Sequence, residues 1–173
     1  MDPSYFTLDN TCKIATVFIA VANILWIVYV FFQNKKSSDE RDERSRKIGL
    51  LKTLVLDCSM PHLYKFFSEV KIEVKKLREK NLTDDAKKKI NATIIELEQK
   101  FENDFLDVLL AINDDLYENM KMQADSMVDQ FTNAIFDPGI NLYVEDKFND
   151  KIASKLVETK RMMIKTLFSY KGD

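Results

Sequence analysis

The sequence is poor in the residues that form turns and reactive sites. It has three glycines, three prolines, two cysteines and one histidine among 173 residues. So few turn formers, with abundant Lys and Glu, disfavour a turn-rich β fold and favour long helices. The glycines, at positions 49, 139 and 172, form no phosphate-binding loop. Cys12 and Cys58 flank a long apolar run, so we expect no disulfide between them.

The single histidine, His62, also limits the chemistry. A di-iron helical protein needs paired Glu-x-x-His motifs, and a histidine-based zinc site needs more than one imidazole. Cys58 lies four residues before His62, but Pro61 stands between them and no strand framework positions the pair. We therefore expect no enzymatic activity, no metal site and no cofactor.

The charge is nearly balanced, with 26 basic and 28 acidic residues and a formal net charge of −2. A near-neutral chain of this kind is not a general binder of nucleic acid. We expect no duplex nucleic-acid partner, and any anionic ligand has to meet a local basic patch.

Residues 14–32 form a run of nineteen residues without a charge. As a helix this run is about 28 Å long, close to the hydrocarbon thickness of a bilayer. No basic residue precedes Lys13, and the segment after the run lacks a small-x-small cleavage site, so a signal peptide is disfavoured. The run predicts a retained transmembrane helix.

The flanking charges predict the orientation of this helix. Before the run the only basic residue is Lys13, whereas six follow it closely: Lys35, Lys36, Arg41, Arg44, Arg46 and Lys47. The positive-inside rule then places the N-terminus outside and the remaining 141 residues in the cytoplasm. Sequons at Asn81 and Asn91 are interpreted as chance matches.

Thr16, Ala20 and Asn23 are spaced to share one face of the transmembrane helix. Small and polar residues on one face permit close contact between helices, and an amide in hydrocarbon needs a polar partner. We expect this face to associate with a second copy. The alternative is a lone tether in which Asn23 bonds its own backbone.

The sequence predicts four parts: an external tail (1–13), the span (14–32), a charged stalk (33–47) and a helical cytosolic domain (48–173). Ser37 and Glu40 have capping-box spacing, so a new helix is expected to begin there. A break is expected at Cys58–Pro61, with Ser59 as a cap.

Apolar residues repeat at helical spacing through the rest of the chain. Thr83 is a predicted cap, and a stripe from Ile90 to Met120 follows, with a kink or restart at residues 113–115. Residues 137–139 (Asp-Pro-Gly) predict a turn, and the last helix is expected over residues 141–170 with a stripe that includes Val144. We predict an all-α chain, with one transmembrane helix followed by an antiparallel bundle of four or five long helices.

Basic residues cluster at positions 75–78, 87–89 and 160–165 of the predicted domain, and aromatic residues lie next to basic ones at positions 64–66 and 168–171. In a symmetric homo-oligomer each lysine becomes a ring of positive charge, which suits a multiply charged anionic ligand, and aromatic rings stack on bases. The candidate ligand-binding residues are His62, Tyr64, Lys65, Lys75, Lys76, Arg78, Lys160 and Arg161. The alternative is ordinary surface charge. Carboxylates at residues 96–107 are interpreted as a solvated face.

The layout of span, stalk and helices to residue 170 resembles small membrane-anchored bacterial defence effectors. In particular it is similar to an accessory membrane protein of type III CRISPR systems. The resemblance implies a cyclic oligoadenylate ligand, assembly into a homo-oligomer such as a tetramer, and action at the bacterial inner membrane. No ligand-binding residue is carried over from it.

Two other functions remain open from the sequence. One is a membrane-tethered coiled-coil adaptor that recruits a protein partner, for which the Ile90–Met120 stripe is sufficient. The other is a small pore-forming or holin-like protein, which the large and well-patterned domain disfavours.

Overall fold

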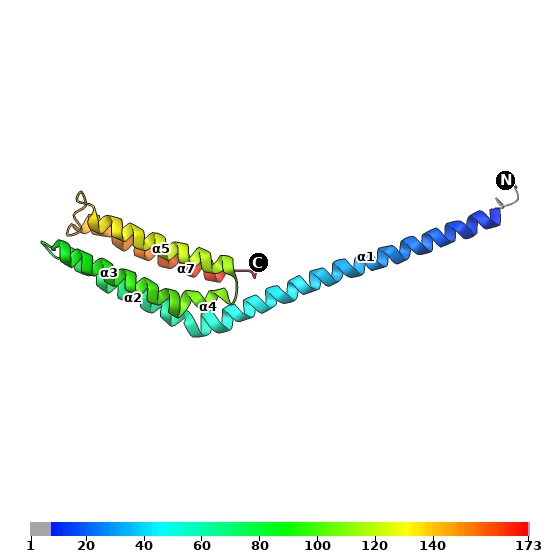
Figure 1. Cartoon of the computed structure of the whole chain (residues 1–173), viewed down its shortest axis with the longest axis horizontal. Coiled ribbons are helices and arrows are strands. Elements are labelled where there is room, and N and C mark those ends of the chain that lie inside the picture. The colour runs from blue at the N-terminus through cyan, green and yellow to red at the C-terminus, as the bar shows by residue number, and fades with distance from the viewer. Residues whose placement is uncertain (1–7, 173) are drawn as a thin grey trace. The chain divides into compact units, whose positions relative to one another are not determined.

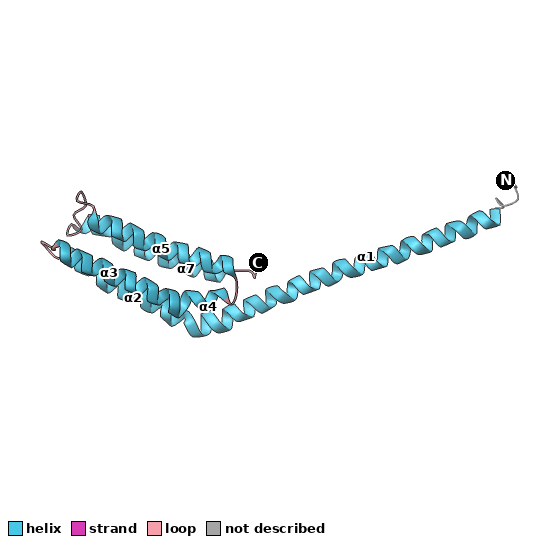
Figure 2. Cartoon of the chain, in the orientation of Figure 1, coloured by secondary structure: helices cyan, strands magenta, loops and turns pink. Residues whose placement is uncertain are grey.

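The computed structural model describes residues 8–172, and the side chains from Phe18 onward. All regular secondary structure in this part of the chain is helical, as Figure 2 shows, and no strand occurs in it. The predicted all-α class is confirmed. The chain forms two compact units that divide after Arg44, and each is described by itself.

The first unit consists of helix α1 (Leu8–Leu50) up to Arg44. From Phe18 to Phe32 its side chains are exposed, except for the half-buried Val30. This helix is long and apolar enough to be a membrane span or a signal sequence. The helix start predicted at Ser37 is wrong, because α1 continues through it. The Ser37 hydroxyl instead accepts a hydrogen bond from Arg41, one turn later (3.4 Å).

The second unit, called here the helical domain, starts at Ser45. Its first helix continues from α1 as η2 (Leu51–Ser59), α2 (Met60–Lys75) and η3 (Lys76–Arg78). The other elements are α3 (Asp84–Phe101), η4 (Glu102–Leu106), α4 (Asp107–Leu110), α5 (Asp114–Phe136), α6 (Glu145–Phe148), η5 (Asn149–Ala153) and α7 (Ser154–Ser169). Figure 1 labels the α-helices.

The break expected at Cys58–Pro61 is wrong, because the helix passes through it with a π-helical register. Proline lacks an N–H and its ring clashes with the carbonyl four residues earlier in an α-helix. In η2 the wider register accommodates the ring, and the Met60 N–H donates to the Val55 carbonyl. Ser59 does not cap α2, since its hydroxyl donates to the Leu54 carbonyl (2.7 Å).

The predicted turns between the helices are confirmed. Thr83 caps α3 by accepting from the Ala86 N–H (3.2 Å), and the restart expected at residues 113–115 is the N-cap of α5. The carboxylate of Asp137 accepts from the Gly139 N–H (2.7 Å) in the Asp-Pro-Gly turn. The final helix starts at Glu145 rather than at residue 141, and Val144 is exposed rather than part of its buried stripe.

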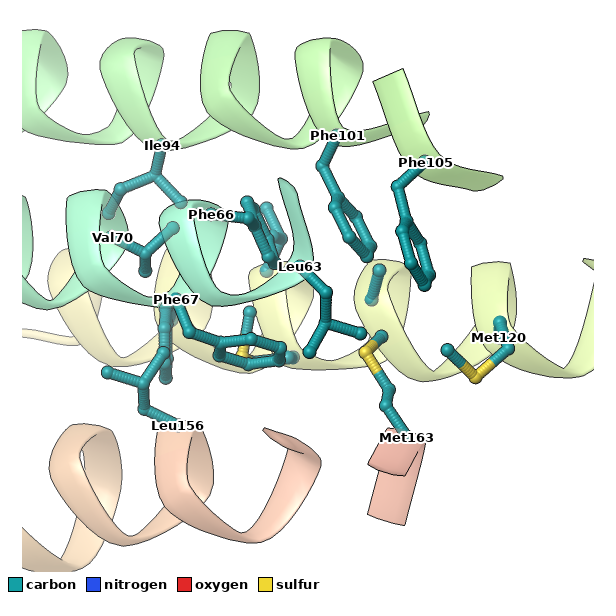
Figure 3. Close-up of a cluster of buried hydrophobic side chains, with 14 of the residues drawn as sticks. Leu63, Phe66, Phe67, Val70, Ile94, Phe101, Phe105, Met120, Leu156 and Met163 are labelled. Atoms are coloured by element: carbon teal, nitrogen blue, oxygen red, sulfur yellow. The ribbon is translucent and has the colours of Figure 1, made fainter. Parts of the chain in front are cut away.

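The helices of the domain enclose one hydrophobic core (Figure 3). Helix α2 packs on α3, α3 on α5, and α5 on α7, whereas contact between α2 and α7 is sparse. The rings of Phe66 and Phe101 stack with centroids 4.3 Å apart, and Phe105 continues the stack (5.1 Å). The sparse α2–α7 contact leaves a seam along the outside of the core.

Candidate functional site

The side of α2 and η3 that faces the seam carries four aromatic or basic residues. Tyr64, Lys71, Lys75 and Arg78 are separated by seven, four and three residues, which is the spacing of a single helical face. All four are exposed. The opposite face of α2 is buried in the core, so packing holds this row of side chains toward solvent.

A groove of about 640 Å³ lies between this row and the last helix of the chain. Its basic rim is Lys71, Lys75 and Arg78, and its apolar wall includes Phe148, Leu156 and Val157. We call it the α2–α7 groove. Pockets for small molecules commonly have volumes of roughly 300–1,000 Å³ and combine apolar walls with a few polar groups.

The rim of the groove is positively charged. The Arg78 guanidinium lies over the Phe148 ring, 5.8 Å from its centroid, and 3.6 Å from the Glu145 carboxylate. Among the described residues Lys71 and Lys75 take part in no ion pair. Two cationic side chains therefore face this groove without an anionic partner among the residues that the structure describes.

The rim continues past the groove through a contact between α2 and α7. The Lys160 ammonium lies 4.6 Å from the centroid of the Tyr64 ring, which is the geometry of a cation–π pair. Arg161, the next residue of α7, is exposed. The structure thus brings together residues from two of the predicted basic and aromatic clusters, which are far apart in the sequence.

Three other predicted ligand residues lie elsewhere. His62 is 3.8 Å from Asp104, and Lys65 is 3.9 Å from Glu69, in a crevice of only about 10 Å³ between α2 and α3. Lys76 donates a hydrogen bond of 2.6 Å to the buried Glu73. All three residues therefore have partners within the domain, and none of them lines the α2–α7 groove.

Sequence reasoning missed part of the groove. Lys71 lies seven residues before Arg78 and seven after Tyr64, so its spacing alone places it on the same face. Phe148 and Val157 were not identifiable in this way, because their role depends on how α6 and α7 pack against α2.

The predicted transmembrane association face is only partly described. Ala20 and Asn23 are exposed in α1. The side chain of Thr16 lies outside the described residues. Association through this face stays a prediction.

A second polar site lies where α3 meets α5. Glu102 Oε1 accepts hydrogen bonds from the Tyr117 hydroxyl (2.9 Å) and from the Lys121 ammonium. The Lys121 hydrogen bond, followed by that of Tyr117, lowers the pKa of Glu102. The same carboxylate raises the pKa of Lys121. This cluster ties the π-helical segment η4 to α5.

Glu98 lies beside this cluster in a less favourable environment. Its Oε1 atom is buried, with no hydrogen-bond partner in the part of the chain that the structure describes. Burial, followed by the charges of Asp125, Asp129 and Glu102, raises the pKa of Glu98 to about 7. The interpretation of residues 96–107 as a solvated face is wrong at Glu98, because α5 covers it.

The described residues contain no group of three or more His, Cys, Asp or Glu side chains arranged to hold a metal ion. Comparison of the chain with protein-family models, with curated proteins and with solved structures finds no match.

Proposed function

We propose that this chain is a membrane-anchored bacterial defence effector whose helical domain binds a multiply charged anionic ligand in the α2–α7 groove. The ligand class is cyclic oligoadenylate, and the protein acts as a homo-oligomer at the inner membrane, with the domain an antiparallel bundle in the cytoplasm. The observation that carries the proposal is the groove, with an apolar wall and a basic rim on which Lys71 and Lys75 have no ion-pair partner among the described residues.

The groove has both features that a nucleotide requires. Lys71 and Lys75 offer ammonium groups to phosphates, and the exposed Val157 offers apolar surface to bases. The Tyr64 ring beside Lys160 extends this combination along the seam. A ligand bridging these residues would bind α2 to α7, the two neighbouring helices whose contact is sparse.

The adaptor alternative has less support. Its motivating stripe supplies the core of the domain itself, since Ile94, Phe105 and Met120 are fully buried. These side chains are not presented to another protein, so the proposal retains ligand binding.

The test is calorimetric titration of the full chain, in neutral detergent, with cyclic oligoadenylates of several ring sizes. We expect one ring size to bind. Lys75→Glu should weaken binding by about tenfold or more, equivalent to ~1.4 kcal/mol, because it replaces an attractive charge with a repulsive one. The matched control is Lys88→Glu, at an exposed position of α3 outside the groove. Absence of binding heat for every ring size would refute the proposal.

A further inference from the structure

The helical domain carries its charges unequally on its helices. Residues 60–78 (α2 and η3) contain five basic and two acidic residues, and residues 145–169 (α6 to α7) contain six basic and four acidic. By contrast, α5 contains five acidic residues and one basic, and residues 84–110 contain seven acidic and four basic. The near-neutral total charge therefore conceals two positive and two negative helical segments.

The packing order places these charges on two different sides of the domain. The positive segments α2 and α7 adjoin each other at the groove. The negative charge of the other side lies on α5 and on η4 and α4, which contact α5, because α3 itself carries four acidic and four basic residues. Figure 1 shows the four helices as two neighbouring layers, with α2 beside α3 in one layer and α5 beside α7 in the other, so each charged side includes a helix from both layers. Positive charge lines the seam between α2 and α7, and negative charge gathers on α5 and on residues 102–110.

The negative side is centred on α5. Glu118, Asp125 and Asp129, which we call the acidic ridge, line a shallow hollow of about 370 Å³ together with Met122. The one lysine of α5, Lys121, is hydrogen-bonded to Glu102, so its charge is already compensated. The Met122 side chain, 63% exposed, stands among the carboxylates.

We propose that the acidic ridge of one copy of this chain docks into the α2–α7 groove of a second copy. The carboxylates would pair with Lys71 and Lys75, whose charges have no partner within the described chain. Met122 would contact the exposed Val157 at the wall of the groove. Complementary charge of this kind sets the register and the specificity of an interface more than its bare affinity.

Such an interface is heterologous, because the two copies contribute different surfaces. Each copy keeps a free ridge or a free groove for the next one, so the contact generates rings or open chains of subunits. The inference goes beyond the proposed function, although it concerns the same groove. The ridge and an anionic ligand would compete for it, so ligand binding would release the ridge–groove contact, and the homo-oligomer of the proposed function would then be held by another surface, such as the predicted association face of the span.

A second copy explains more of the charge distribution than an anionic membrane surface does. A lipid surface would attract the basic side alone and leave the acidic ridge without a role. A second copy neutralises both sides with one contact. Membrane binding by the basic side is therefore an outcome that the test has to distinguish.

The test is photo-crosslinking of the full chain in neutral detergent, with benzoylphenylalanine replacing Met122. Mixed isotope-labelled and unlabelled copies identify the crosslinks that join two chains. We expect such crosslinks to reach α2 or α7, and to disappear at about 1 M salt, where the Debye length falls to about 3 Å. The same photo-reactive residue at Leu110, exposed outside both surfaces, is the control.

Charge reversal makes the test specific. Reversing the groove (Lys71→Glu with Lys75→Glu) or the ridge (Asp125→Lys with Asp129→Lys) should each remove the crosslink. A chain that carries all four changes should regain it, which an unfolded variant would not. The proposal is overturned if the four changes together do not restore the crosslink, or if groove reversal abolishes only binding to phosphatidylglycerol vesicles. Calorimetry with the ligand still decides the proposed function separately.

Discussion

At the scale of single residues, Glu98 of α3 lies against α5 with one carboxylate oxygen buried and unpaired. Burial of Glu98 opposes its ionisation, and so do the negative charges of Asp125, Asp129 and Glu102. Together they raise the pKa of Glu98 from 4.5 to about 7. The positive charge of Lys121 lowers the pKa of Glu98 but offsets only part of the increase. Since the folded state holds the Glu98 proton at a pH where the unfolded state has lost it, this residue makes stability depend on pH.

We expect the contribution of Glu98 to stability to fall as the pH rises from about 4.5 to about 7, because the folded state binds the additional proton in that window. Glu98→Gln keeps the shape and removes the charge. It should raise stability at about pH 8 by roughly 1 kcal/mol, a figure reduced for the partial exposure of the side chain. Thermal unfolding of the full chain, followed by circular dichroism, measures the change.

The control is Glu96→Gln, an exposed carboxyl on the same helix. It should leave the pH dependence of unfolding unchanged. Equal melting temperatures for Glu98→Gln and the parent chain at both about pH 5 and about pH 8 would contradict the assignment.

The special position of Glu98 was not predictable from the sequence. In the pattern it is one of several acidic residues on a helix, and what sets it apart is the approach of α5 more than twenty residues later. The groove and the α2–α7 contact beyond it were partly predictable, because charge and aromatic clustering select Lys75 and Arg78 on the groove and Tyr64 and Lys160 beyond it. Clustering did not separate these from Lys65 and Lys76, whose partners are neighbours on their own helix.

At the scale of elements, Asn113 decides whether residues 84–136 form one helix or two. Its backbone is extended, and its side-chain oxygen accepts a hydrogen bond from the Leu116 N–H (2.8 Å). This cap starts α5 after α4 has ended at Leu110, so α5 can pack beside α3 instead of extending it (Figure 1).

Asn113→Ala removes the capping acceptor and should destabilise the domain by about 1 kcal/mol. Asn113→Asp retains an acceptor oxygen at the same position and should cost much less. Urea unfolding of the two variants in parallel measures the difference, because the slope with denaturant is expected to be the same for both. If Asp and Ala destabilise the chain equally, the cap does not hold the start of α5.

The helix starts also show which N-cap residues can be predicted from the sequence. Thr83 and Asn113 act as caps because the preceding residues leave the helical conformation, so the side-chain oxygen meets a free N–H. Ser37 and Ser59 have the same chemistry but lie inside continuous helix. Pro61 lacks a backbone N–H, and the helix continues through this position because the preceding segment, η2, is π-helical. No local residue pattern indicated this change of helix type.

At the scale of the whole molecule, the predicted orientation of α1 as a membrane span determines which compartment the groove of the proposed effector faces. The basic residues after the apolar run favour a cytoplasmic domain. Asn81 provides a way to test this, because it belongs to an Asn-Leu-Thr sequon in an exposed loop. The other sequon, at Asn91, lies within α3, and its side-chain oxygen accepts a hydrogen bond from Thr132 (2.8 Å).

Expression in eukaryotic microsomes reports the side of the membrane, because sequons are glycosylated only in the lumen. With Asn91→Gln present throughout, we expect no glycan on Asn81, since the positive flank should hold the domain on the cytoplasmic side. Reversing Lys35, Lys36, Arg41 and Arg44 to Glu, with lysines added to the tail, should invert the helix and produce a glycan that Asn81→Gln removes. This inverted chain shows that Asn81 is competent for modification. A glycan on Asn81 in the chain with its own flanks would place the groove outside the cytoplasm, where no cytoplasmic nucleotide reaches it.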